Sequence, residues 1–309
     1  MSMSSKEEEN KPGCNNSARS KSYISIPADV LYQYELFSRY NSPYTAHEQG
    51  SAIDLYPPGN KALSPVGGEV IDIQTVKGPA KPYAVEKDHL IIIDTESGNI
   101  EFQIADNVPA LARIMHVKPE VSAGDQVQIG DSLGQLVRAG FFAPWVENHL
   151  HLGFRAPGAN YLRASGSLPL KIDINVEPLT WKGRGRVKEA GETYVVLDSP
   201  RHPYQGEAFV AIADDSGSMP LDGGLPHFSR GGMFSEHSGS VKLLGTEIGT
   251  VEAGYVDWKP VQVYANGKPI TGLSLFAAQT DWFGARLVCP EAFFEPGESI
   301  KVEIRRANF

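Results

Sequence analysis

Two histidines one residue apart stand in an otherwise apolar run, WVENHLHLGFR, over residues 145–155. On a β-strand, residues i and i+2 face the same way, so His149 and His151 would project from one face, about 7 Å apart along the strand. Two imidazoles that face one point can bind a metal ion or exchange protons with a substrate. The alternative is a pair of partly exposed histidines on the solvated side of a sheet.

Groups suited to the same chemistry lie upstream in two separate segments. His47 is followed seven residues later by Asp54, in HEQGSAID, and His116 closes the apolar run ARIMH. A histidine and an aspartate that flank a glycine-containing loop can supply one nitrogen and one oxygen to a metal ion. If His47 is no ligand, Glu48 is the nearest substitute. For His116, the alternative is a strand-end histidine with one backbone hydrogen bond.

The elements that must position these residues are mostly β-strands. Short β-branched runs bounded by Gly, Pro, Asn or Asp follow residue 60, namely PVGGEVIDI, HLIIID, EFQIA and ARIMHV. This texture is typical of an all-β barrel or sandwich. The glycines of residues 117–137 predict tight turns between further short strands. One helix is expected over residues 27–40, PADVLYQYELFSRY, where apolar residues repeat at roughly helical spacing.

The length of 309 residues and a change in the sequence pattern at about Glu177 predict two domains. After Glu177, alternating strands such as TYVVLD and ESIKVEI recur, and Asn266-Gly267 predicts a type I′ hairpin. We therefore expect a disordered polar tail over residues 1–22 and a first β domain over 23–178. A β-sandwich-like domain over 179–309 would be a structural or interaction module, or would position a substrate or partner.

Composition excludes several classes of function. The formal net charge is −9 and no dense Lys/Arg block occurs, so we expect no nucleic-acid ligand. No run reaches the roughly 18 apolar residues of a membrane-spanning helix. The two cysteines, Cys14 and Cys289, exclude a cysteine metal cluster, so any metal site must use His, Asp or Glu. The N-terminus lacks the apolar core of a signal peptide, so from this sequence we expect a cytoplasmic protein.

Taken together, these motifs resemble the lysostaphin-type zinc metallopeptidases, which cleave glycine-rich peptide bonds in bacterial cell-wall cross-bridges. The resemblance covers roughly residues 44–156. It rests on a His-to-Asp opening before ALSPVGGEV, the strand HLIIID, a histidine shortly before VSAGDQVQIGDSLGQL, and the closing HxH of NHLHLGFR. Relatives in this family are mostly exported.

The resemblance implies that His47, Asp54 and His151 bind zinc, with His116 and His149 as acid/base and oxyanion groups beside the open coordination position. Three protein ligands plus water is the pattern of a catalytic zinc site, in which the metal activates the water for attack on a peptide carbonyl. The expected substrate is a glycine-containing or cell-wall-like peptide. The alternative is a non-catalytic binding protein that reuses the same barrel.

One feature departs from the family pattern. The opening histidine and aspartate of the family are normally four residues apart, whereas His47 and Asp54 are seven apart. An insertion of three residues must loop out if both side chains are to reach one ion.

The segment FVAIADDSGSM looks like the DxSxS turn with which von Willebrand type A domains hold magnesium, through Asp214, Ser216 and Ser218. That fold alternates strands and helices, whereas this segment is followed by glycine-rich loops and sequence patterns typical of β-strands. A carboxylate with two hydroxyls is also ordinary turn chemistry, which is the expected role.

The remaining histidines are expected to have no role in the site. His89 begins a strand, and three others lie in Gly- and Pro-rich loops, where we expect surface positions: His202, His227 and His237. The aromatic residues just before the HxH strand either form a wall of the substrate pocket or pack between strands: Phe141, Phe142 and Trp145.

Overall fold

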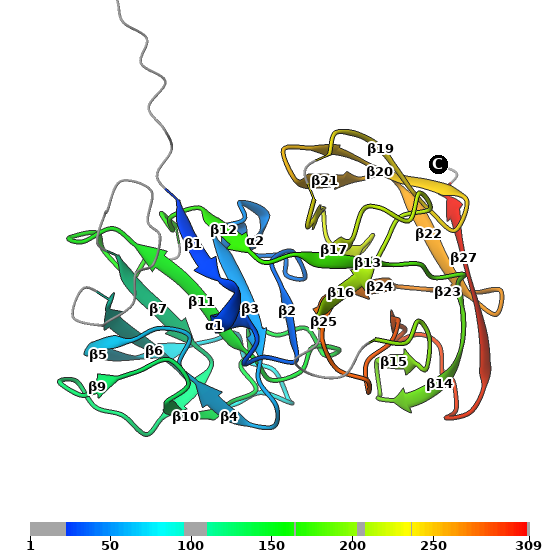
Figure 1. The fold of residues 1–309 in the computed structure, drawn as a ribbon. Helices are drawn as coiled ribbons and strands as arrows, with labels where there is room; N and C mark the ends of the chain where they lie inside the picture. Colours follow the sequence, from blue (N-terminus) through cyan, green and yellow to red (C-terminus); the bar gives the residue numbers. More distant parts are fainter. Residues whose placement is uncertain (1–22, 96–109, 164, 203–207, 236, 308–309) are drawn as a thin grey trace, which may run out of the picture.

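The computed structural model describes residues 23–95, 110–163, 165–202, 208–235 and 237–307, and the regular structure in them is almost entirely β-strand (Figure 1). The predicted all-β class is therefore confirmed. The predicted tail over residues 1–22 and the predicted strand EFQIA over residues 101–105 lie outside the described residues.

The first half of the chain is built on a ten-stranded sheet with two small sheets beside it. The order in the large sheet is β13 (Val176–Leu179), β16 (Phe209–Ile212), β25 (Ala277–Ala278), β2 (Leu36–Ser38), β3 (Ala52–Tyr56), β11 (Leu150–Arg155), β7 (Leu111–Met115), β6 (Lys87–Asp94), β5 (Gly68–Lys77) and β9 (Gln126–Val127). The small sheets are β4 (Lys61–Leu63), β10 (Ser132–Leu136) and β8 (Val117–Pro119), and the parallel pair β1 (Ile24–Pro27) and β12 (Leu170–Asp173).

The second half forms a twelve-stranded sheet. Its order is β19 (Gly239–Leu243), β20 (Thr246–Glu252), β21 (Tyr255–Trp258), β18 (Arg230–Met233), β17 (Leu221–Leu225), β24 (Gly272–Leu275), β26 (Arg286–Val288), β15 (Tyr194–Leu197), β14 (Arg184–Ala190), β27 (Ser299–Arg306), β22 (Val261–Ala265) and β23 (Lys268–Ile270). The predicted hairpin is confirmed: Ala265 pairs with Lys268, and Asn266 and Gly267 between them have φ of 49° and 77°, both positive as a type I′ turn requires.

The two halves are joined through the ten-stranded sheet. Strands β13, β16 and β25 come from the second half of the sequence, and β25 pairs with β2 through Leu36 and Ala278 (Figure 1). Side chains of these added strands, including Phe209 and Ala211, belong to the apolar core of the first half. The second half therefore packs directly against the strands that carry the candidate site.

Both helices are single turns, α1 (Ala28–Leu31) and α2 (Thr45–Glu48), and among the described residues no helix has the length and apolarity needed to cross a membrane. The helix predicted over residues 27–40 is wrong beyond its first turn. The chain from Leu36 forms β2, which is buried between β3 and β25. Strand pairing on both sides overrides the weak helical periodicity of the sequence.

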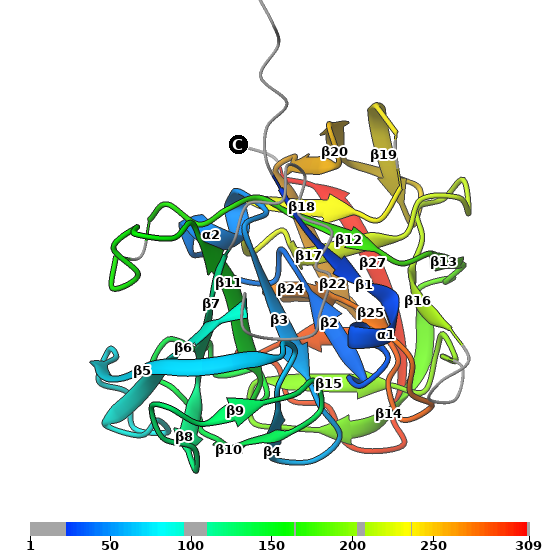
Figure 2. The same cartoon turned by 60° about the vertical axis from the view of Figure 1, so that its left-hand side comes forward.

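Strands β3, β11 and β7 lie side by side in the large sheet (Figure 2). They send alternate residues to opposite faces of that sheet, as the two-residue period of a strand requires. One set fills the core with fully buried apolar side chains: Ile53, Leu55, Leu150, Leu152, Phe154 and Ile114. On the opposite face, His151 pairs with Asp54 on one side and with Met115 on the other. The strand register thus brings a histidine and an aspartate together.

Candidate metal centre

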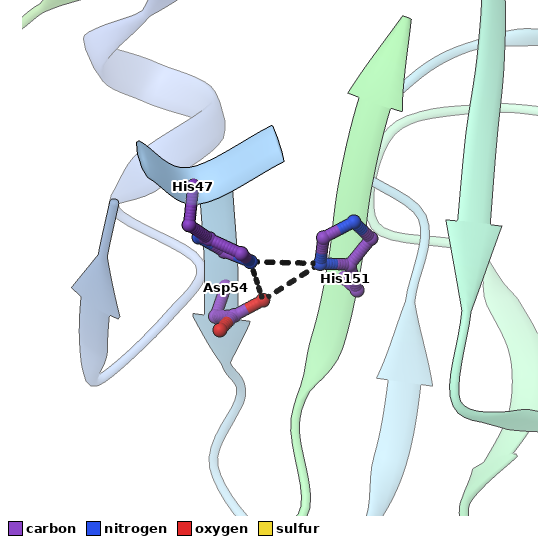
Figure 3. A group of neighbouring side chains, drawn as sticks. All are labelled: His47, Asp54 and His151. Carbon is purple, nitrogen blue, oxygen red and sulfur yellow. Dashed lines mark hydrogen bonds and ion pairs between the residues drawn. The ribbon is translucent and has the colours of Figure 1, made fainter. Parts of the chain in front are cut away.

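His47, Asp54 and His151 converge from three separate elements (Figure 3). Asp54 lies on β3 and His151 on the neighbouring β11, where the two residues are directly paired. His47 lies on α2, at the end of these strands, and its ring points toward the other two side chains (Figure 3). His47 and Asp54 are almost completely buried, and the side chain of His151 is 15% exposed.

The three facing atoms form a small triangle. His47 Nε2 lies 3.1 Å from His151 Nδ1 and 3.3 Å from Asp54 Oδ1, and His151 Nδ1 lies 3.0 Å from the same oxygen. Ligands about 2.0–2.1 Å from a tetrahedral zinc ion are roughly 3.3 Å from one another. The spacing and the donor set therefore fit one face of a zinc site. Two histidines and one carboxylate also form the facial triad of non-haem iron sites.

The longer spacing between His47 and Asp54 is accommodated by a compact turn. Helix α2 carries His47, and Gly50 then adopts φ of +60°, which lets the chain turn into β3 two residues later. Glu48, the alternative ligand, faces away from the cluster and accepts a hydrogen bond from Ser229 at 2.7 Å. The insertion thus does not keep His47 from the cluster.

A hydrogen bond from the opposite side of its ring orients His47. Its Nδ1–H donates to the backbone carbonyl of Arg39 at 2.7 Å, so in the neutral ring Nε2 carries the lone pair that faces Asp54. The backbone at Arg39 is in turn held from the second half, because its N–H donates to Asp222 Oδ2 at 2.7 Å and Ser38 donates to Oδ1 at 2.6 Å. Burial raises the pKa of Asp222 to about 6.

His116 lies beside the cluster and is held by a carboxylate. Its Nδ1 is 2.6 Å from Asp88 Oδ2, and its backbone N–H donates to Asp88 Oδ1 at 3.0 Å. His116 sits between β7 and β8 with φ of +73°, a conformation that side-chain-bearing residues adopt at a cost. The two bonds to Asp88 compensate for that cost and leave Nε2 as the ring nitrogen not used by Asp88. The ring centroids of His116 and His149 are 5.4 Å apart.

His149 is the second ring beside the cluster. Its Nδ1–H donates to the carbonyl of Glu147 at 2.9 Å, and its Nε2 lies 3.5 Å from Asp54 Oδ2. The ring stacks on Phe142 with centroids 4.1 Å apart. Glu147 is itself held from the second half by an ion pair with both terminal nitrogens of Arg286, whose side chain is 1% exposed. Two links from the second half therefore reach the site, through Arg39 and through Glu147.

Burial and mutual charge set the protonation of the cluster. Burial lowers the pKa of both His149 and His151 to about 4, so both rings are neutral at pH 7, the form in which histidine binds metals. Burial would also raise the pKa of Asp54, but His47, His149 and His151 together hold it well below its usual range. For His47, burial lowers the pKa, and the charge and hydrogen bond of Asp54 outweigh it and raise the pKa overall.

A cavity of about 620 Å³ opens beside the cluster, and His116, His149 and His151 lie in its wall. Most of the wall is apolar, and four aromatic rings contribute to it: Tyr44, Phe141, Phe142 and Phe228. Phe141 and Phe142, two of the three aromatic residues before the HxH strand, thus line the cavity, which agrees with the pocket-wall alternative. Trp145 instead packs edge-on against His227, with centroids 5.6 Å apart.

The other histidines lie away from the cluster. His237 is exposed, as expected, the surface prediction is wrong for His202, and His227 is half-buried. His202 is 6% exposed and packs against Phe283, and burial lowers its pKa to about 4. The ring nitrogens of His227 are buried beneath neighbouring aromatic side chains. Sequence flanks rich in Gly and Pro did not reveal these aromatic contacts.

The DxSxS segment forms a turn closed by its own hydrogen bonds. Ser216 Oγ donates to Asp214 Oδ1 at 2.6 Å and lies 2.7 Å from Ser218 Oγ, and the N–H of Met219 donates to the same carboxylate oxygen at 3.2 Å. The expected turn role accounts for all three side chains.

Among the residues that support the site, Asp88, Glu147, Arg286 and Asp222 were missed from sequence. Asp88 is a charged residue at the start of the apolar strand KDHLIIID, and Glu147 stands two residues before His149, so both carried a local signal. Arg286 carried none, because it lies 139 residues from its partner Glu147.

Fold and site together define a two-domain all-β protein with a buried His-Asp-His cluster at the edge of an aromatic-walled cavity. The chain belongs to the DUF8155 family. Residues 25–172 match the model described as "Domain of unknown function (DUF8155) N-terminal domain", and residues 177–305 match the corresponding C-terminal domain. No curated protein and no solved structure matches the chain.

Proposed function

We propose that this protein is a zinc-dependent metallopeptidase of the lysostaphin type, with zinc held by His47, Asp54 and His151. The main support for this proposal is the triangle of two imidazole nitrogens and one carboxylate oxygen, which lie 3.0–3.3 Å apart and come from three separate elements. Three lone-pair-bearing atoms at this spacing repel one another unless a proton or a cation lies among them. The cavity beside them gives a substrate access.

In this proposal, bound zinc supplies a Lewis acid that polarises a peptide carbonyl and lowers the pKa of the attacking water. His149 would take the proton of that water at Nε2, because its Nδ1–H is donated to the carbonyl of Glu147. His116, whose Nδ1 is held by Asp88, would offer its Nε2 side to the negative charge that develops on the carbonyl oxygen. Asp88 fixes the tautomer and the orientation of His116.

The proposed substrate is a short peptide segment that contains glycine, as in cell-wall-like peptides. A residue without a side chain would let the backbone approach the buried cluster closely. The aromatic wall formed by Phe141 and Phe142 would pack against the neighbouring part of the peptide.

The test is the metal content of protein purified without chelator, measured by elemental mass spectrometry for zinc and iron together. We expect about one zinc per chain, lost in His151→Ala and kept in His237→Ala, a matched change at an exposed histidine of the second half. Glycine-containing peptides would then be screened for cleavage. No zinc after reconstitution would reject the proposal in favour of a non-catalytic binding protein, and a stoichiometric iron content would reject the peptidase chemistry.

A further inference from the structure

Arg113 is a buried cation beside the cluster with no bonding partner among the described residues. Its side chain is on β7, the residue is 7% exposed, and its Nε is buried without an acceptor. The charged group that acts on it is Arg155, a second cation, and burial together with Arg155 lowers the pKa of Arg113 to about 10. The residue lines the cavity, and a guanidinium that is largely removed from water without an acceptor is stabilised by an anionic ligand there.

The strand register places Arg113 close to the cluster on the same face of the sheet. On β11, His151 pairs with Met115 and Gly153 pairs with Arg113. Two residues along a strand span about 7 Å, so Arg113 lies about 7 Å along the sheet from the paired residues His151 and Met115. Gly153 presents no side chain on this face, and Arg113 lines the same cavity as His47, Asp54 and His151. A ligand in that cavity can therefore contact the cluster and the guanidinium together.

We infer that Arg113 binds a carboxylate of the substrate, a step that rests on the proposed peptidase function. Guanidinium and carboxylate pair through two parallel hydrogen bonds, an arrangement that fixes both position and direction. An extended peptide advances about 3.3–3.6 Å per residue, so the carboxylate belongs to a residue one or two positions from the cleaved bond. It is either the chain terminus or the side chain of an acidic residue, which offer the same group.

The inference narrows the substrate class. An uncharged glycine bridge has no group to pair with Arg113, and such a substrate would leave the buried cation unpaired beside it. A glycine-containing peptide with a carboxylate near the cleaved bond satisfies both the cluster and Arg113. Lys77 also lines the cavity but is exposed, so its charge is already solvated and adds little discrimination.

The test measures binding to the chelator-treated full chain by titration calorimetry, which needs neither metal nor turnover. The probes are N-benzoyl-Gly-Gly, its C-terminal amide, and N-benzoyl-Gly-Asp-amide. We expect an acid probe to bind about 10- to 100-fold more tightly than the Gly-Gly amide, as for one charge-assisted hydrogen-bonded pair. The acid that binds more tightly distinguishes a chain terminus from an acidic side chain.

Three variants test whether Arg113 causes the preference for acid over amide probes. Arg113→Gln should abolish the difference between acid and amide, Arg113→Lys should retain part of it, and Lys77→Gln should retain all of it. Equal binding of the three probes to the wild type, no binding of any probe, or an equal loss in Lys77→Gln would overturn the inference. The wild-type comparison needs no variant to fold. A chain that binds zinc but not the acids would keep the proposed function and reject this inference. A chain that binds the acids but no zinc would keep Arg113 as a carboxylate-binding residue and reject the peptidase function.

Discussion

The cluster around Asp54 and the turn around Asp214 both contain a carboxylate that is less than 5% exposed. At Asp214, the partners are a hydroxyl and an N–H from the next five residues. At Asp54, the partners are imidazoles from other elements, with His151 97 residues away in sequence. The turn satisfies its carboxylate with donors from its own short segment, whereas the cluster brings a carboxylate and imidazoles from separate elements to one point.

This difference separates a structural motif from a candidate site. A local turn can form in many folds, because its hydrogen bonds need only a few consecutive residues. The convergence at Asp54 requires the register of β3 and β11, the helix that carries His47, and supports from the second half of the chain. Tertiary structure that brings lone pairs together has a free-energy cost, which binding of a cation would repay.

The largest effect should come from the rings beside the cluster. His116→Ala should lower kcat for any cleaved peptide by about 10²- to 10⁴-fold, the usual range for a lost acid/base or oxyanion group, while zinc content stays at the wild-type level. Kinetics and metal analysis on the same preparation check both halves of this prediction.

Asp88→Asn sharpens the result for His116. The amide keeps the shape of Asp88 but removes the negative charge beside the ring. It should therefore lower kcat substantially, with little change in KM. His89→Ala, at the next residue, is the matched control and should leave kcat unchanged. A His116→Ala variant that retains full activity would place His116 outside the chemistry.

An intermediate effect is expected at the link between the halves. Arg286→Met leaves Glu147 without its cation, and because the Glu147 side chain is about one-third exposed we expect a loss of about 2–3 kcal/mol in the free energy of unfolding, below the full cost of breaking a buried pair. Chemical denaturation of Arg286→Met, Glu147→Gln and the double variant measures the coupling.

The double variant should be less destabilised than the sum of the single variants, because neither charge then remains unpaired. If the link also positions His149, Arg286→Met should lower kcat under conditions in which the chain remains folded. Additive stabilities would mean that the ion pair contributes nothing, and the contacts of Asp222 with Ser38 and Arg39 would then be the remaining support from the second half.

The sequence predicted the strands and the members of the cluster better than their supports. The HxH spacing places His149 and His151 on one face by strand geometry alone, and the run HLIIID predicts the strand that forms β6. The tertiary links could not be predicted in the same way. Asp222 and Arg286 reach the site from more than 130 residues away, and Leu36 to Ser38 became a strand because β3 and β25 flank them.

The smallest effect should come from the turn, and it tests the other half of the comparison. Ser216→Ala removes one hydroxyl donor from the carboxylate of Asp214 in a partly exposed turn, so the free energy of unfolding should fall by about 1 kcal/mol. Zinc content and peptide cleavage should not change, and added magnesium should not raise the melting temperature of the wild type. A magnesium-dependent rise that Ser216→Ala removes would mean that the turn holds a cation after all, and that local hydrogen bonding does not distinguish it from the cluster.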